Sequence, residues 1–210
     1  MIPSKSTPPL LLMTRFRSSL VFSVMSLAVV PSAWAVDGTI TINGEITDQT
    51  CKINGKEPPA DILVHLPKIS RSALKMKGDV AGATLFETKL TECPKTLSGS
   101  VKAYFEPGPT TDYDTGNLRA YTTTDAITEA KNNIPSTSSL TQAENVEIEL
   151  ANPDGTRVAI GATTAMGATL TGTEQKSATL RYLARYVKSG EGTIAAGKLV
   201  SYVQYSIVYP

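Results

Sequence analysis

Alternation of polar and apolar residues with a period of two is the feature that most constrains this 210-residue chain. It runs through residues 39–46, 101–105 and 146–150, and residues 180–187 and 199–209 have the same character. A period of two predicts β-strands that bury one face. Clusters of turn-forming residues separate these strands: Asn54-Gly55, Pro58-Pro59, Pro107-Gly108-Pro109, Asn152-Pro153-Asp154-Gly155 and Ser189-Gly190. This spacing predicts one all-β domain built as a two-sheet sandwich.

Helical signal is weak along the whole chain. Two short segments, 71–77 and 125–132, have a helical pattern, and no internal repeat or long linker divides the sequence. We therefore expect a single domain with little helix.

The first 35 residues have the composition of a secretory signal. Three basic residues and no acidic residue precede a 13-residue apolar run at 18–30. The run is followed by Ala33-Trp34-Ala35. This order predicts a signal peptide over 1–35 that is cleaved before Val36. An N-terminal membrane anchor is the alternative, but a bilayer span needs about 20 apolar residues.

Charge and composition exclude several function classes. The formal net charge of +1 becomes −2 when residues 1–35 are removed, so a strongly basic nucleic-acid-binding surface is not expected. With one His and two Cys, a zinc site of the His/Cys type is nearly excluded. We expect no metal and no cofactor.

The two cysteines, Cys51 and Cys93, form an even pair in a chain predicted to be exported. An oxidising compartment favours a disulfide between them, and their spacing is unlike the C-x-x-C of a reactive pair. They lie 42 positions apart, so a bond would contribute about 4 kcal/mol in the chain-entropy model.

Apparent enzyme motifs do not form a coherent catalytic site. Ser72-Ala73-Leu74-Lys75 matches S-x-x-K but lacks its companion motifs, and 192–198 matches a phosphate-binding loop except that Leu199 replaces Ser or Thr. Residues 112–117 resemble the start of a calcium loop, although a turn fits better because the glycine comes one position early. His65 is expected on a strand, facing solvent or a hydrogen-bond partner. We predict no catalytic residues and no enzymatic activity.

The two ends of the domain have ordered apolar faces. One face of the N-terminal stretch consists of Gly38, Ile40, Ile42, Gly44 and Ile46. One face of the C-terminal stretch consists of Val203, Tyr205, Ile207 and Tyr209. Tyr209 is the penultimate residue, and Gly197 is the fourteenth residue from the end.

Together these features resemble the subunits of chaperone–usher fimbriae. Such subunits have a G-T-apolar-x-apolar-x-G-x-apolar stretch before the first cysteine, as in 38–46, and a second cysteine, as in Cys93-Pro94. They also have a glycine near position fourteen from the end and a penultimate aromatic residue. Residues 101–113 resemble the Bordetella serotype fimbrial major subunits in particular. The chain departs from many relatives in ending on Pro210, which has no backbone N–H.

The resemblance implies an incomplete immunoglobulin-like sandwich that lacks its last strand and is completed by a donor strand from a neighbouring subunit. It divides the chain into a signal peptide (1–35), an N-terminal donor-strand extension (36–48) and a pilin domain (49–210). The donor residues would be Gly38, Ile40, Ile42, Gly44 and Ile46. The strand beside the chaperone and acceptor groove would contain Gly197, Val203, Tyr205, Ile207 and Tyr209.

The resemblance also implies the function and the partners. The chain would be a structural subunit that is exported to the periplasm, assembled outside the cell in a fimbria, and able to contribute to host-cell adhesion. Its partners would be identical or related subunits, a periplasmic chaperone and an outer-membrane usher. Burial of three donor isoleucines would contribute about 5–9 kcal/mol.

Several alternatives stay open from the sequence. The N-terminal stretch would also suit an ordinary first strand of its own domain, and Tyr209 an ordinary core position. A fimbrial tip adhesin or lectin that binds host glycans is the alternative function, although such adhesins are generally longer. Arg181, Arg185 and Lys188 suggest a polyanion patch for sulphated host glycans, whereas a solvated strand face is the simpler interpretation.

Overall fold

The computed structural model describes residues 40–48 and 50–210. The chain divides into two units, Met1–Glu45 and Ile46–Pro210. In the first unit the described residues, 40–45, form no strand. The predicted signal peptide, the beginning of the extension and Gly38 lie outside the described residues.

The elements of the second unit are β1 (Lys52–Ile53), η1 (Arg71–Ala73), β2 (Val80–Cys93), β3 (Ser100–Glu106), β4 (Thr111–Asp112), β5 (Asn117–Thr123), η2 (Thr137–Ser139), β6 (Gln142–Ala151), β7 (Arg157–Val158), β8 (Ala168–Thr169), β9 (Lys176–Lys188), β10 (Lys198–Val200) and β11 (Gln204–Val208).

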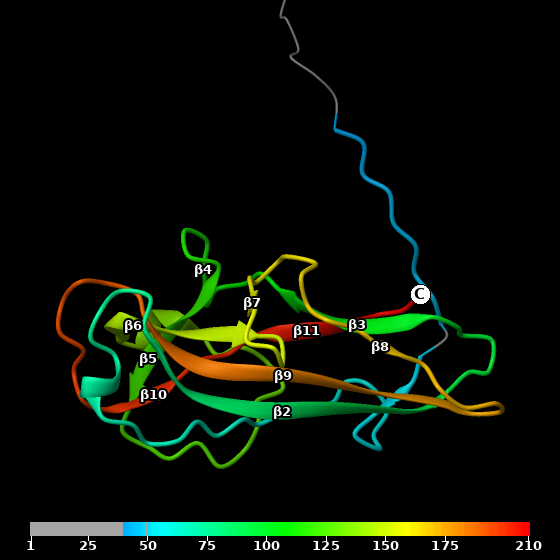
Figure 1. Ribbon diagram of the computed structural model, residues 1–210, viewed down its shortest axis with the longest axis horizontal. Coiled ribbons are helices and arrows are strands. Elements are labelled where there is room, and N and C mark those ends of the chain that lie inside the picture. Colours follow the sequence, from blue (N-terminus) through cyan, green and yellow to red (C-terminus); the bar gives the residue numbers. More distant parts are fainter. Residues whose placement is uncertain (1–39, 49) are drawn as a thin grey trace, which may run out of the picture. The chain divides into compact units, whose positions relative to one another are not determined.

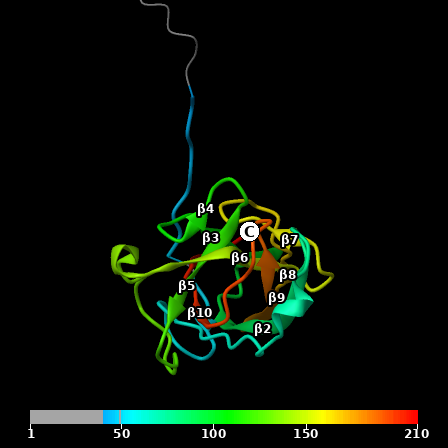
Figure 2. The same ribbon diagram turned by 90° about the vertical axis from the view of Figure 1, so that its left-hand side faces the viewer.

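The second unit consists of two antiparallel sheets (Figure 1). The larger sheet has the order β1-β2-β9-β6-β5-β10, with β4 beside β5 and β7 beside β6. The smaller sheet has the order β11-β3-β8. Figure 2 views the same strands from one end. The all-β prediction is confirmed.

Three of the alternating segments form strands that have a neighbouring strand on each side. The predicted strands 101–105, 146–150 and 180–187 lie within β3, β6 and β9. Strand β9 lies inside the larger sheet between β2 and β6, so its cationic residues Arg181, Arg185 and Lys188 are not on an edge strand. Strands β2 and β5 were missed, because Gly82 and a register shift interrupt the pattern of β2 and β5 has no strict alternation.

The C-terminal stretch 199–209 divides into two strands instead of forming one. β10 pairs with β5 of the larger sheet, and β11 pairs with β3 of the smaller sheet. Residues 201–203 connect the two strands without a ladder partner. The chain therefore crosses from one sheet to the other at this point.

The core lies between the sheets and centres on Tyr182 of β9, which is fully buried. Its ring packs edge-on against Phe105 of β3, with 5.2 Å between ring centroids. The Tyr182 hydroxyl donates to the Met166 carbonyl at 2.8 Å and accepts the Ala103 N–H at 3.0 Å, so the buried polar atom is satisfied. This packing joins the two sheets.

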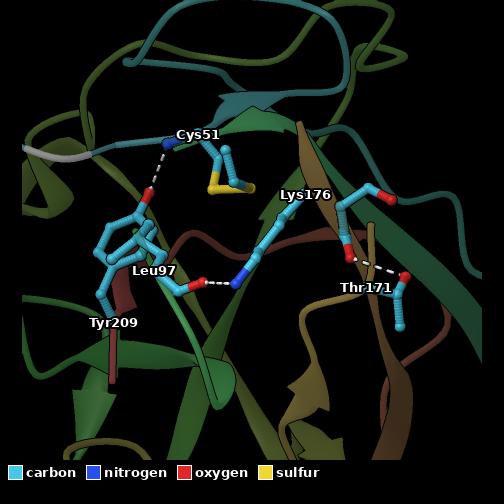
Figure 3. Close-up of a disulfide and its surroundings, with 7 residues drawn as sticks. Cys51, Leu97, Thr171, Lys176 and Tyr209 are labelled. Atoms are coloured by element: carbon cyan, nitrogen blue, oxygen red, sulfur yellow. Dashed lines mark hydrogen bonds between the residues drawn. A yellow bond between two sulfur atoms is a disulfide. The ribbon is translucent and has the colours of Figure 1, made fainter. Parts of the chain in front are cut away.

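The predicted disulfide between Cys51 and Cys93 forms. It links the residue before β1 to the last residue of β2, and both cysteines are buried (Figure 3). Since Cys51 immediately follows the N-terminal extension, the bond fixes the start of the domain to its longest strand.

Three sequence predictions of local structure were wrong. Segment 71–77 contains only the short 3-10 turn η1, because the Asp79 carboxylate binds the N–H groups of Lys75 and Met76 and ends the turn. Segment 125–132 is not helical: it has no buried residue, and so short a helix needs tertiary packing. Residues 62–66 around His65 form no strand, although His65 is exposed as expected.

Candidate functional site

A groove of about 1410 Å³ lies over the core within the second unit. Its floor contains side chains from five strands of the two sheets: Phe86, Phe105, Leu118, Ile148, Leu150 and Tyr182. Its lining also includes residues 58–66 and a long run of the C-terminal segment from Gly197 to Tyr209. Residues from 123–134 complete the lining, and strands β10 and β11 lie within the C-terminal segment. An apolar floor beside strands suits an extended apolar peptide.

The C-terminal segment contributes all five residues predicted for the acceptor strand. Gly197, Val203, Tyr205, Ile207 and Tyr209 all line the groove. The four larger side chains are partly buried and pack against the core. The side chains at 203, 205, 207 and 209 therefore share the face of this segment that packs against the core.

Strands β10 and β11 are each the last strand of their sheet. Within residues 40–48 and 50–210, no strand pairs with their second edge. An edge of this kind presents N–H and C=O groups to an additional strand. The groove thus combines an apolar floor with a free strand edge.

The facing segment, 58–66, has no ladder partner among the described residues. Val64 and Leu66 pack against the core, whereas Asp61 and His65 are exposed. The sequence analysis missed this wall, because Pro58-Pro59 indicated a turn and the segment has no strand neighbour that would reveal its role.

Two tyrosine hydroxyls connect the C-terminal segment to the N-terminal part of the domain. The Tyr205 hydroxyl donates to the Ala60 carbonyl with an oxygen–oxygen distance of 2.5 Å. The Tyr209 hydroxyl accepts the Cys51 N–H at 3.0 Å (Figure 3). Burial, and secondarily the charge of Asp61, raise the pKa of Tyr205 above its ordinary value, so it stays protonated as a donor. No local pattern predicts these contacts, since they join residues far apart along the chain.

The residues predicted to form the donor face are exposed where the structure describes them. The side chains of Ile40, Ile42 and Ile46 are 88%, 90% and 100% exposed, and a side chain added at Gly44 would meet no atom within 4 Å. Three isoleucines this exposed on one alternating stretch form an apolar face that is not buried within the described residues.

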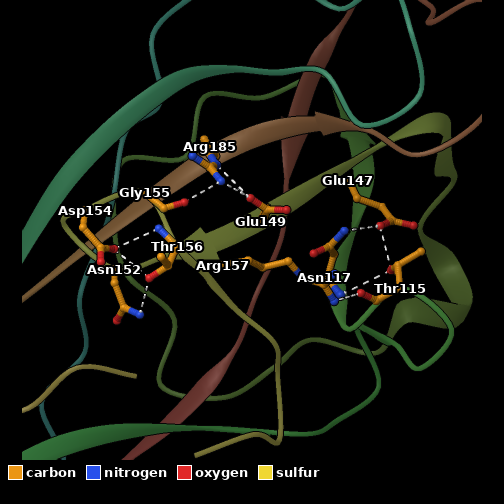
Figure 4. Close-up of polar contacts among 10 residues, drawn as sticks. All are labelled: Thr115, Asn117, Glu147, Glu149, Asn152, Asp154, Gly155, Thr156, Arg157 and Arg185. Carbon is orange, nitrogen blue, oxygen red and sulfur yellow. Dashed lines mark hydrogen bonds and ion pairs between the residues drawn. The ribbon is translucent and has the colours of Figure 1, made fainter. Parts of the chain in front are cut away.

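The three predicted polyanion-binding residues do not form a cluster of unpaired cations. Arg181 contacts Glu87 at 2.8 Å, and the Nε of Arg185 donates to Glu149 at 2.7 Å (Figure 4 shows the second pair). Lys188 is buried, donates to the Gly192 carbonyl, and lies on the opposite face of β9 by the strand alternation.

A polar cluster on the outer face of the larger sheet holds loops in place. Glu147 is buried and accepts from the Thr115 hydroxyl at 2.8 Å and the Asn117 amide at 2.9 Å (Figure 4). Burial alone would raise the pKa of Asp112, but the N–H groups of Thr115 and Asp114, and Arg119 nearby, lower it below its ordinary value. These contacts make residues 112–117 a hydrogen-bonded turn.

The remaining motifs have structural surroundings. The Ser72 hydroxyl bonds that of Ser70 at 2.8 Å, and residues 192–198 connect β9 to β10 with no helix after them. The described residues include no group of three or more His, Cys, Asp or Glu side chains placed to bind a metal. Nor does that part of the chain contain a helix long and apolar enough to cross a membrane.

Comparison with known proteins gives a consistent result. The family model "Type-1 fimbrial protein, A" matches residues 66–210. The serotype 3 fimbrial subunit of Bordetella pertussis is 46% identical over 209 residues, covering 94% of this chain and 100% of the relative. Fimbrial protein FimX of the same organism is 47% identical over 186 residues, covering 85% and 92%. A subunit from a chaperone–usher pilus structure aligns with a TM-score of 0.53 and 20% identity, covering 86% of this chain and 100% of that one, which shows a shared fold.

Proposed function

Because the chain belongs to the type-1 fimbrial protein family, we propose that it is a structural subunit of a surface fimbria and polymerises by donating its N-terminal extension to the groove of the next copy. The observation that carries this proposal is the groove itself. It runs along the free edges of β10 and β11, and its floor is the apolar core of the domain. The occupant we infer is residues 36–48 of a second copy.

The chemistry of the extension supports this occupant. Ile40, Ile42 and Ile46 alternate with polar residues, so a strand laid along the groove would turn all three toward the floor. Each isoleucine would contribute about 1.5–3 kcal/mol on full burial. Gly44 would allow a close backbone approach. The backbone of the extension would pair with the free edge, which is β-augmentation.

The proposal assigns a role to each part of the chain. Residues 1–35 direct export and are removed, residues 36–48 form the donor strand, and residues 49–210 form the pilin domain. Export to an oxidising compartment accounts for the disulfide between Cys51 and Cys93.

The same groove accounts for the partners. An empty apolar groove beside an unpaired edge favours aggregation, so a periplasmic chaperone would occupy it until an outer-membrane usher exchanges the chaperone for the next extension. The final assembly lies outside the cell. This role needs no catalytic group and no cofactor, so we propose that the chain is not an enzyme.

A tip adhesin or lectin is less well supported. A tip subunit needs no extension of its own to donate, whereas this chain has an alternating stretch before Cys51. Any contribution to adhesion would come from the assembled fimbria.

The test is a deletion of residues 36–46. The shortened chain should still bind its chaperone, because the groove is intact, and it should no longer form fibres. In SDS without heating, wild-type surface material should run as a ladder of multiples of one subunit mass. Normal fibres from the deletion variant would refute the donor assignment.

A further inference from the structure

The Tyr205 hydrogen bond joins the two walls of the groove. Tyr205 lies on β11, one wall, and Ala60 lies in segment 58–66, the facing wall; both line the groove. The hydroxyl donates to the Ala60 carbonyl with 2.5 Å between the oxygens. The side chain packs against the core and its hydroxyl reaches segment 58–66, so the bond ties together two segments that line the groove.

That space is where an additional strand would lie. Neighbouring strands in a sheet are about 4.7–4.9 Å apart, so a strand between the two walls needs them about 9–10 Å apart. Its backbone N–H groups would pair with carbonyls of the segments that line the groove, and the Ala60 carbonyl would be one such acceptor. The Tyr205 hydroxyl already donates to this carbonyl.

The second tyrosine contact has a different character. Tyr209 binds the N–H of Cys51, which is fully buried, disulfide-bonded and not part of the groove lining. That contact anchors the end of the C-terminal segment to a fixed point. Of the two, the bond of Tyr205 is the one whose partner an incoming strand would require.

We propose that Tyr205 is a positioning residue that acts as a latch on the empty groove: its hydrogen bond to Ala60 holds the two walls together and must open before a donor strand inserts. The latch rests on the proposed function, because it concerns entry of the donor strand. While the hydrogen bond is present, the Ala60 carbonyl is not available to pair with the backbone of another segment. Breaking this hydrogen bond adds to the activation free energy of strand entry, and that part of the barrier depends only on the Tyr205 hydroxyl.

The test removes the hydroxyl and keeps the ring. A fluorescently labelled peptide of residues 36–48 is mixed with the purified chain from which residues 36–46 are deleted, so that no neighbouring copy can fill the groove with its own extension, and association is followed by stopped-flow anisotropy. In Tyr205→Phe the association rate constant should rise by about twofold to tenfold, the effect of one net hydrogen bond, with the dissociation rate unchanged.

Tyr104→Phe is the matched control. The Tyr104 hydroxyl also donates to a backbone carbonyl, that of Gly161 at 3.0 Å, but neither residue lines the groove. Both variants should lower the melting temperature to a similar extent, and only Tyr205→Phe should accelerate peptide entry. A general effect of lost stability would accelerate both.

The outcomes separate the latch from the proposed function. If the peptide does not bind the deletion chain that keeps Tyr205, the donor-strand proposal fails. If it binds and Tyr205→Phe takes it up at the wild-type rate or more slowly, the latch is refuted while the proposed function stands. Should Tyr205→Phe not fold, tyrosine-labelled wild type answers the question by NMR: the ring signal of Tyr205 should change on peptide addition with that of Tyr104 unmoved, and an unmoved Tyr205 signal refutes the latch.

Discussion

Replacing Ile42 by Ala tests the donor face of the extension at a single residue. The Ile42 side chain is 90% exposed in the free chain, so nearly all of its burial would occur on insertion into a neighbouring groove. The substitution removes three carbon atoms, and each buried CH₂ contributes about 0.8 kcal/mol. The lost binding free energy is therefore about 2 kcal/mol, which corresponds to a roughly 30-fold weaker dissociation constant.

The assay measures the dissociation constant of a labelled peptide of residues 36–48 for the purified subunit. Thr41→Ala is the control, since alternation places Thr41 on the opposite face and its loss should change affinity by less than about twofold. Equal weakening by the two substitutions would mean that the peptide does not bind as a strand with one buried face. Stronger weakening by Thr41→Ala would mean that the opposite face is buried, and the assignment of Ile40, Ile42 and Ile46 would be wrong.

Three further predictions concern the domain itself. Replacing Cys51 and Cys93 by Ser should lower the free energy of unfolding by about 4 kcal/mol in urea titrations; an unchanged midpoint would contradict a stabilising disulfide. Because the folded-state pKa of Asp112 is lowered, its carboxylate stabilises the fold above pH about 4 and loses this effect as the pH falls through the folded-state value. Asp112→Asn should therefore be less stable by about 1 kcal/mol near pH 6, with the difference closing in acid, and a difference that persists at pH 2 would contradict this cause. The double variant Arg181→Ala/Arg185→Ala should elute from heparin at the wild-type salt concentration, since both guanidinium groups are paired with carboxylates; earlier elution would support the polyanion patch.

Sequence reasoning predicted a strand correctly where one face is apolar and the other polar, and where the neighbouring strands belong to the same chain. Alternation in β6 and β9 predicted both strands, because these central strands bury one face against the core. The crossing of the C-terminal segment between sheets was not predictable, because alternation is the same whichever sheet a strand joins. The role of 58–66 was also missed, because this segment has no ladder partner among the described residues.

The residues predicted for the acceptor strand line the groove, but the contacts that organise them were not predictable from the sequence. Gly197, Val203, Tyr205, Ile207 and Tyr209 follow from periodicity and family resemblance, and all line the groove. The bond between Tyr205 and Ala60 joins residues 145 positions apart, so local pattern contains no trace of it. The same holds for the carboxylate partners of Arg181 and Arg185, which changed the interpretation of that face.

The disulfide determines how this domain would respond to mechanical force. A pull along the N-terminal extension reaches Cys51 first, and the covalent bond to Cys93 passes the load to the end of β2, which is paired along its length with β9. The residues between the two cysteines are thereby shielded from tension. A reduced subunit would have no such shield, and extension of the 42 positions between Cys51 and Cys93 would release roughly 140 Å of slack chain. The bond therefore makes each subunit a short, inextensible link whose length under load is set by its folded domain.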